Sequence, residues 1–352
     1  MAEIWNERLV VRNFGPVRNL DIEIRPLTLF IGTQGSGKST VSKLLAVCRE
    51  ALQFNYDSVD IARDFADYAI EDYVEEDTYF CYYSGEFQVK YENGGFSVPM
   101  NDRYKRETLY VPADRNLIGS LSNSLATIMA ARVPLPTPLL EYMSLFERAT
   151  KDSPKYEIPF FGVNYVTKDN RNMIELRGKD KTLPLSASSS GLQSAIPMLM
   201  VIDYALKAES TKAFVIEEPE QNLFPENQRE VLNFVASRLG SGDGGRQFIV
   251  TTHSPYMLSC LNVLMLAHKL HKYEGLREQT ESIVKPEFMV NPDHVAAYSL
   301  MPDAEDGVYC KSLISEKTGM VSVNELDSAS VSIGEDFDRL YRLYVKMIKD
   351  RK

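Results

Sequence analysis

Cysteine is scarce in this chain of 352 residues, and long apolar runs are absent. The four cysteines lie far apart and include no Cys-x-x-Cys pair, which excludes a disulfide framework and a cysteine zinc knuckle. No uncharged apolar stretch reaches the length that a membrane-spanning helix requires. Residues 1–5 show no basic and then apolar leader. We therefore expect a cytoplasmic protein that makes no contact with a membrane.

Basic residues are also few: the chain has 39 basic and 49 acidic residues, which gives a net charge of −10. Nucleic-acid-binding proteins usually present a basic face, so this balance argues against one. The acidity is local, however: residues 57–77 hold nine acids and one base. Apolar residues recur there at helical spacing, which predicts a helix with a solvated acidic face, a partner-docking surface being the alternative. Residues 148–181 hold eight bases and five acids, and are the best candidate for contacting DNA phosphates.

The order of the predicted elements indicates an α/β protein. Alternating residues predict an antiparallel hairpin at 8–12 and 20–25, and a β-meander spans 78–100. Buried strands at 27–31, 213–216 and 247–251 alternate with apolar helices, which is typical of a mostly parallel sheet covered on both faces. Further helices are predicted at 39–54, 116–131, 138–150, 192–208, 226–239 and 335–352, a strand at 108–111 and hairpins at 162–185.

A complete phosphate-binding motif, G-x-x-x-x-G-K-S, lies between the strand at 27–31 and the helix that follows. Glycines in such a loop let backbone N–H groups surround phosphates. Lys38 supplies a positive charge, and the Ser39 hydroxyl is a ligand for Mg²⁺. The residues predicted to bind ATP here are Gly32, Gln34, Gly35, Ser36, Gly37, Lys38, Ser39 and Thr40.

Two adjacent acids, Glu217 and Glu218, follow the buried strand at 213–216 directly. Phosphoryl transfer depends mainly on positioning and electrostatics. We expect Glu217 to hold Mg²⁺ and Glu218 to orient or deprotonate the attacking water. His253 follows the strand at 247–251, where it is expected to donate to the γ-phosphate.

Together these residues resemble the ABC-type P-loop ATPase heads of the RecF, SMC and OLD-like AAA families, across nearly the whole chain and without a TOPRIM nuclease domain. In that family a Ser-Gly signature of one subunit closes on the γ-phosphate held by the other. The resemblance assigns this role to Ser190 and Gly191, at the start of an apolar helix whose free N–H groups suit a phosphate. Leu192 stands where the usual signature has a second glycine.

Other short motifs carry the resemblance further. Residues 222–225 are similar to the family's D-loop, which crosses the dimer interface, and Asn13 and Phe14 are similar to its N-terminal element beside the nucleotide. The loop that usually presents a glutamine to magnesium is occupied by residues 110–115, which contain none, so Asp114 is the candidate replacement.

The resemblance implies an ABC-ATPase-type α/β fold with a mostly parallel core sheet, an N-terminal antiparallel β subdomain and an inserted α/β lid. We expect residues 1–115 and 186–352 to form the ATPase head and 116–185 the lid. ATP with Mg²⁺ would close a homodimer that controls DNA or an effector protein such as a nuclease or toxin, in anti-phage defence or DNA repair. The alternatives are an OLD-like nuclease-associated ATPase and the ATPase subunit of an ABC transporter.

Overall fold

The structure is a computed structural model. It describes residues 7–322 except 101–103, 105, 122–126, 128–129, 132–134, 209–210, 241–244, 303 and 305–306. The helix predicted at 335–352 lies outside the described residues. No helix in the described part of the chain has the length and apolar character needed to cross a bilayer.

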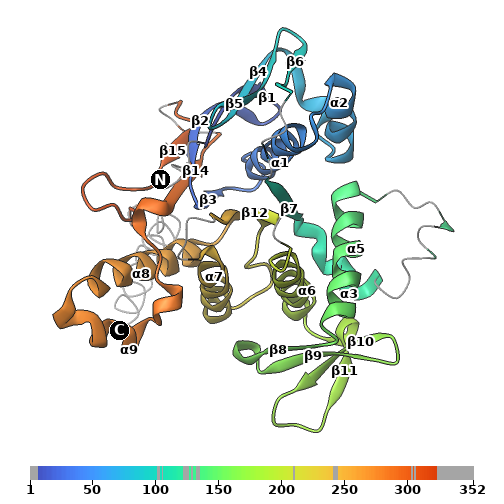
Figure 1. Ribbon diagram of the computed structural model, residues 1–352, viewed down its shortest axis with the longest axis vertical. Coiled ribbons are helices and arrows are strands. Elements are labelled where there is room, and N and C mark those ends of the chain that lie inside the picture. The colour runs from blue at the N-terminus through green and yellow to red at the C-terminus, as the bar shows by residue number, and fades with distance from the viewer. Residues whose placement is uncertain are drawn as a thin grey trace, which may run out of the picture.

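A six-stranded sheet forms the centre of the molecule, with the strand order β15-β14-β3-β13-β12-β7 (Figure 1). The strands from β14 to β7 are parallel, and β15 pairs antiparallel with β14 at one edge. Every residue of β13 is buried. The strands are β3 (Leu27–Gly32), β7 (Glu107–Val111), β12 (Thr211–Glu217), β13 (Gln247–Thr252), β14 (Val295–Leu300) and β15 (Cys310–Ser312).

Helices cover both faces of this sheet, as expected for parallel strands. On one face lies α1 (Lys38–Phe54), whose apolar side packs against Phe30, Val215 and Ile249. On the other face, the alternate side chains Phe214 and Phe248 contact a second core. The helices of that core are α6 (Ser190–Ala205), α7 (Pro225–Leu239) and α8 (Pro255–His271), with the short α9 (Arg277–Ile283) after α8.

An antiparallel sheet with the order β2-β1-β4-β5-β6 covers the outer side of α1. Its strands are β1 (Glu7–Phe14), β2 (Val17–Ile24), β4 (Val74–Ser84), β5 (Phe87–Glu92) and β6 (Gly95–Ser97), and α2 (Ser58–Asp67) packs beside it. The Arg49 guanidinium on α1 is fully buried and pairs with Glu7 at 2.8 Å. This ion pair attaches α1 to the sheet, and the strands agree with the predicted hairpin and meander.

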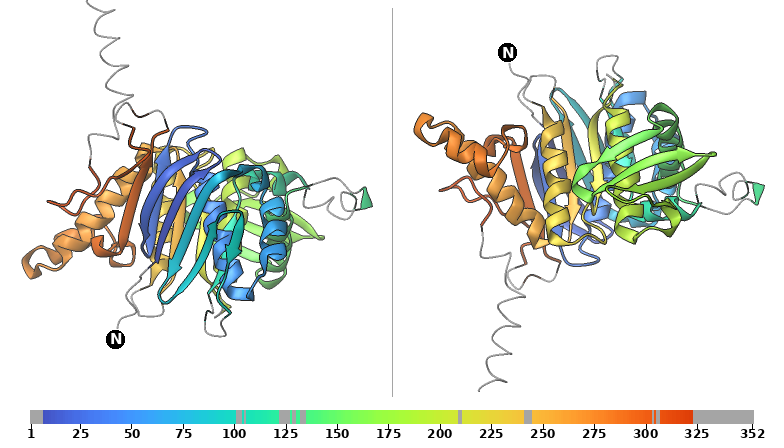
Figure 2. Two further views of the ribbon diagram at one scale, coloured as in Figure 1. Left: turned by 90° about the horizontal axis from the view of Figure 1, so that it is seen from above. Right: turned by 90° about the horizontal axis from the view of Figure 1, so that it is seen from below.

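The described part of residues 116–185 contains a second antiparallel sheet, which lies on the opposite side of the molecule from the N-terminal one (Figure 2). They include α3 (Leu117–Leu121), α5 (Thr137–Asp152) and a sheet of β8 (Lys155–Ile158), β9 (Val163–Lys168), β10 (Arg171–Leu176) and β11 (Thr182–Pro184). Tyr142 and Phe146 of α5 share one core with α6. The segment thus continues the core of the neighbouring helices, and its separation as a lid stays a prediction.

The α/β class, the mostly parallel sheet and the N-terminal antiparallel sheet are confirmed. The strand β14, which pairs with β3 along its whole length, was not predicted. Within the helix predicted at 116–131, the structure describes α3, whereas part of the remainder lies outside the described residues.

Candidate nucleotide site

The phosphate-binding loop connects the end of β3 to the first residue of α1. Gly35 and Gly37 have φ angles of 76° and 92°, a region that side chains other than glycine rarely adopt. A Cβ atom on Gly32 would stand 2.5 Å from the carbonyl oxygen of Leu300. Glycine is therefore required at these positions by backbone geometry.

Lys38 lies across this loop. Its ammonium donates to the carbonyl oxygens of Gly32 at 2.9 Å and Thr33 at 2.8 Å. Burial lowers the pKa of Lys38 to about 8, and the nearby charges of Glu218 and Glu220 oppose that shift. An anion at the loop would replace the carbonyl contacts with a full negative charge, so the site favours a phosphate.

The other loop residues divide into exposed and buried ones. Gln34, Gly35 and Ser39 are exposed, while Ser36 and Thr40 are buried. The Ser39 hydroxyl thus lies at the exposed start of α1, a position suited to the predicted Mg²⁺ ligand.

A tyrosine that the sequence motif did not include supports the loop from behind. The Tyr309 hydroxyl donates to the carbonyl oxygen of Ser36 at 2.6 Å. It also lies so close to Gly37 that a Cβ atom there would be 2.5 Å from its oxygen. The Tyr309 side chain is buried, so this contact fixes the loop from a segment near the C-terminal end of the described chain.

Glu217 ends β12, two strands away from β3. Its side chain is buried, and its Oε2 atom accepts a hydrogen bond from the backbone N–H of Ala113 at 3.3 Å. Its Oε1 atom has no hydrogen-bond partner among the described residues. A buried carboxylate oxygen without a donor is suited to Mg²⁺ or a water bound to it, so this residue fits the metal that was expected.

Glu218 and His253 meet at the carboxyl edge of the sheet. The His253 Nε2 atom lies 3.4 Å from Oε1 of Glu218, and both side chains are partly exposed. Glu218 has a φ of 44°, a conformation unusual for a residue with a side chain, and its N–H donates to the carbonyl of Thr251 at 3.0 Å. Such local strain, held by neighbouring contacts, is common at functional sites.

Arg115 holds the acidic turn in place, a role that sequence reasoning missed. Its guanidinium is fully buried and donates to the carbonyl oxygens of Glu217 and Glu218, each at 2.5 Å. Asp114, the expected replacement for the missing glutamine, is exposed beside it. The segment after β7 therefore contacts the acidic turn through Arg115 and the Ala113 N–H.

Glu220 connects the same turn to the end of β13. Its carboxylate accepts from the Thr252 hydroxyl at 2.6 Å and from the His253 N–H at 2.9 Å. Burial raises the pKa of Glu220, which these hydrogen bonds partly offset. Glu220 thereby fixes the backbone of His253 relative to Glu218.

The predicted signature lies at the start of α6, with Ser190 exposed and Gly191 buried. The Ser189 hydroxyl caps the helix by accepting from the Leu192 N–H at 3.4 Å. A Cβ atom on Gly191 would be 2.6 Å from the carbonyl oxygen of Asn222, in the segment similar to a D-loop. The two motifs are thus in contact within one chain.

Asn13 and Phe14 lie at the end of β1. The Phe14 ring is fully buried among Phe65, Tyr73 and Phe80, which leaves it no surface for a nucleotide. This burial argues against the predicted contact between Phe14 and ATP. Asn13 donates to Asp77 at 2.6 Å, and its contribution to nucleotide binding stays a prediction.

The basic segment 148–181 runs from the end of α5 through the four-stranded sheet. Some of its bases already pair with carboxylates, namely Lys151, Lys155, Lys168 and Arg177. The charge available to DNA phosphates is therefore smaller than the composition alone indicates.

A loop of phosphate-binding geometry after β3, paired acids at the end of β12 and a histidine after the strand between them form the arrangement that the resemblance to ABC-type P-loop ATPase heads implies. Residues 114–258 match the family model described as an AAA ATPase domain. This match supports the expected resemblance to the RecF, SMC and OLD-like ATPases, and it covers the signature, the acidic turn and His253.

A curated relative is the OLD nuclease of Thermus scotoductus (strain ATCC 700910 / SA-01), which is 23% identical over 313 residues. The match covers 71% of this chain and 59% of that protein. Among solved structures, the chain is similar to an SMC head bound to the C-terminal winged-helix domain of ScpA, with 14% sequence identity and a TM-score of 0.42. This match covers 89% of this chain and 99% of the other. It is also similar to the SMC head domain of Thermotoga maritima, with 14% identity, a TM-score of 0.41 and coverage of 73% and 91%.

Proposed function

We propose that the protein binds ATP with Mg²⁺ and hydrolyses it at this site. The observation that carries the proposal is the contact between Glu218 and His253 at the sheet edge that also bears the phosphate-binding loop. Lys38 and the loop N–H groups would hold the phosphates, and Ser39 and Glu217 would hold the metal. Bound Mg²⁺ would neutralise charge on the phosphates.

Glu218 is the residue that would orient the attacking water and accept its proton. Its backbone is fixed by Arg115 and by the Thr251 carbonyl, so the carboxylate needs little reorganisation before reaction. His253 lies beside it and would donate to the γ-phosphate, while Glu220 holds the histidine backbone.

The test is a pair of variants assayed with ATP and magnesium. Lys38→Ala should lose nucleotide binding, because it removes the ammonium that lies across the loop. Glu218→Gln should bind ATP normally and lose at least about 100-fold in turnover, since one positioned base contributes about 10²–10⁴-fold. Unchanged turnover in Glu218→Gln would remove this residue from the reaction.

We propose further that two copies close around two ATP molecules. The support is the start of α6, where Ser190 is exposed and Gly191 is buried beside it; the N–H groups and positive dipole end of this helix suit the γ-phosphate of a second copy. Ser190→Arg should then bind ATP as a monomer without closing. Mixing Ser190→Arg with Lys38→Ala should restore some turnover, because one site of the mixed dimer keeps both halves intact.

Light scattering of Glu218→Gln with and without ATP measures the closure itself. A mass that ATP leaves unchanged, together with no recovered activity on mixing, would contradict a shared site.

The client of this switch is proposed to be DNA or an effector protein, in anti-phage defence or DNA repair. The relative named OLD nuclease favours a second candidate, in which ATP hydrolysis accompanies DNA cleavage. Within the described residues, no group of three or more His, Cys, Asp or Glu side chains could hold a metal ion. A magnesium-dependent nicking assay separates the candidates: cleavage by the purified chain favours the nuclease, and ATP hydrolysis without cleavage favours the switch.

A further inference from the structure

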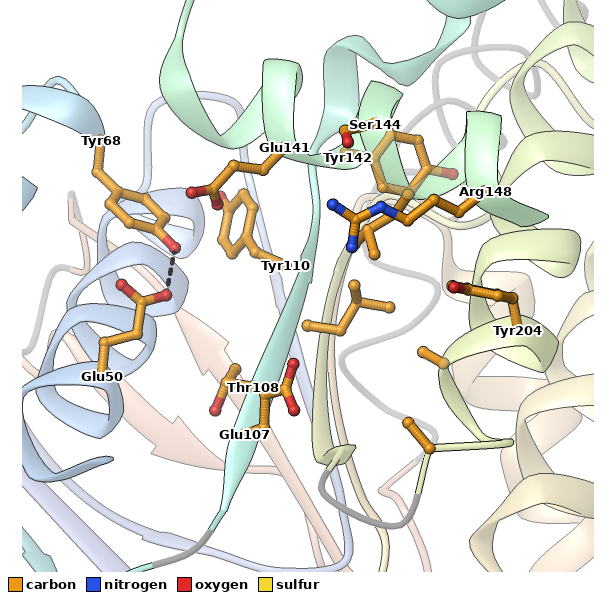
Figure 3. A pocket seen from close by; sticks show the side chains of 14 residues that line it. Glu50, Tyr68, Glu107, Thr108, Tyr110, Glu141, Tyr142, Ser144, Arg148 and Tyr204 are labelled. Carbon is orange, nitrogen blue, oxygen red and sulfur yellow. Dashed lines mark hydrogen bonds between the residues drawn. The ribbon is translucent and has the colours of Figure 1, made fainter. Parts of the chain in front are cut away.

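A pocket of about 430 Å³ lies beside β7, the edge strand of the central sheet (Figure 3). Its walls come from α1, β7, α5 and α6. The pocket therefore lies between α1, which begins at the phosphate-binding loop, and the helices α5 and α6. This volume is in the range of pockets that hold small organic ligands. The described nucleotide-site residues are absent from its lining.

One end of the pocket is acidic. Glu50 on α1 and Glu141 on α5 point into it from opposite walls, and the Tyr68 hydroxyl donates to Glu50 at 3.0 Å. Arg148 and Tyr204 lie at the other end (Figure 3). Glu107 on β7 adds a third acid to the lining, so Arg148 is the only basic side chain among three carboxylates in the described lining.

The two carboxylates lack cations. Among the described residues, no basic side chain forms an ion pair with Glu50 or Glu141. Burial, and next the charge of Asp64, raise the pKa of Glu50 to about 8. Burial and the charge of Asp67 raise the pKa of Glu141. Both groups would be stabilised by a positive charge placed between them.

Unpartnered hydroxyls line the same space. Tyr110 and Tyr142 are more than nine-tenths buried, and their hydroxyl oxygens have no hydrogen-bond partner among the described residues. Figure 3 shows the Tyr110 ring directed toward Glu141. The Tyr68 ring packs edge-on against Tyr110, with 5.3 Å between their centroids. Buried hydroxyls without partners are uncommon in native proteins. The charged neighbour of Tyr110 is Glu217 and that of Tyr142 is Arg115, so the hydroxyl that lies beside the carboxylates is that of Tyr68.

We propose that this pocket binds a primary ammonium group carried on a neutral or anionic tail, such as the side chain of lysine. An ammonium has three donors and no acceptor, which matches the Glu50 and Glu141 carboxylates together with a tyrosine hydroxyl. The aromatic rings add a favourable surface for a cation. Arg148 at the far end disfavours a second positive charge on the ligand and suits a carbonyl or carboxylate.

Calorimetry on the full chain tests the proposal with two ammonium probes, 6-aminohexanoate and Nα-acetyl-lysine N-methylamide. The first probe represents a free amino acid and the second represents a lysine within a protein. The probe that binds with the higher affinity therefore identifies which of these two kinds of ligand the pocket takes. Nα,Nε-diacetyl-lysine N-methylamide, which has no ammonium group, should not bind. Glu50→Gln and Glu141→Gln should each weaken binding by about tenfold or more, because each removes a charged hydrogen-bond acceptor.

Glu147→Gln is the matched control, since Glu147 is exposed on the same helix as Glu141 and pairs with Lys151 outside the pocket. It should bind the probe as the unmodified protein does. Glu141 is itself exposed, so Glu141→Gln should fold normally, which a thermal melt verifies. No binding of either ammonium probe at about 10 mM, or equal affinity in Glu141→Gln and the unmodified protein, would overturn the assignment.

Discussion

Replacing Arg115 with lysine is expected to slow ATP hydrolysis far more than it weakens ATP binding. The guanidinium reaches the carbonyl oxygens of Glu217 and Glu218 at once, each at 2.5 Å, and that of Pro112 at 3.0 Å. A lysine ammonium is a single point of charge and cannot reproduce this forked arrangement. At least one of the acidic residues would therefore lose its support.

The structure allows the size of both effects to be worked out. Hydrogen bonds from a charged group contribute about 1.5–3 kcal/mol each, so loss of one at this fully buried position should lower the free energy of unfolding by about that amount. A displacement of Glu218 by about 1 Å reduces a rate by about 100-fold. The contacts of Lys38 do not involve Arg115, so the affinity for ATP should stay within about threefold.

The assay combines steady-state ATP hydrolysis, nucleotide titration and thermal unfolding of Arg115→Lys. The matched control is Arg49→Lys, because Arg49 is also fully buried but contacts Glu7 and Tyr82 instead of the acidic turn. The control should lose stability and keep its turnover. If Arg115→Lys keeps turnover within about twofold, or if both variants lose turnover equally, Arg115 does not position the acidic turn.

ATP should raise the lowered pKa of Lys38, so the affinity for ATP should be constant below about pH 8 and fall by up to about tenfold per pH unit above it. ATP titrations at about pH 7 and about pH 9 measure this change, and an ATP affinity that is unchanged up to about pH 9 refutes the prediction. Gly191→Ala should lower the free energy of unfolding by about 1–3 kcal/mol, since its Cβ would clash with Asn222, whereas Gly275→Ala, in open space, should leave the melting temperature unchanged. DNA affinity that resists added salt would exclude the segment 148–181 as the contact surface.

The parts of the fold that could be predicted are those that depend on neighbouring residues. The hairpin at β1 and β2 follows from alternation and a Gly-Pro turn, and the phosphate-binding loop follows from glycine spacing between a strand and a helix. By contrast, β14 is as long as β3 but contains the small residues Ala296, Ala297 and Ser299, and its pairing partner β3 is far away in the sequence. No local pattern identifies such a strand.

The candidate site shows the same limit. Glu217, Glu218 and His253 could be located because each follows a recognisable buried strand, and Glu218 and His253 are brought together at the sheet edge. Arg115 could not be assigned, because its partners are backbone carbonyls 102 and 103 positions away, which carry no residue-type signal. For Phe14, a short motif suggests a contact with the nucleotide, whereas the structure buries its ring among other aromatic rings, so that contact stays a prediction.

The position of β3 has a consequence for synthesis of the chain on the ribosome. This strand carries the phosphate-binding loop near the beginning of the sequence, yet both of its hydrogen-bonded neighbours, β13 and β14, are translated some 200 residues or more after it. Until residue 300 has emerged, the nascent chain cannot complete the central sheet, and Tyr309 cannot reach Ser36. The N-terminal sheet and α1 can cover one face of β3, but until then both edges of β3 lack a hydrogen-bonded neighbour. A competent nucleotide site therefore forms only after residue 309 has left the ribosome, and ribosome-bound fragments that end before it should neither bind ATP nor dimerise through it.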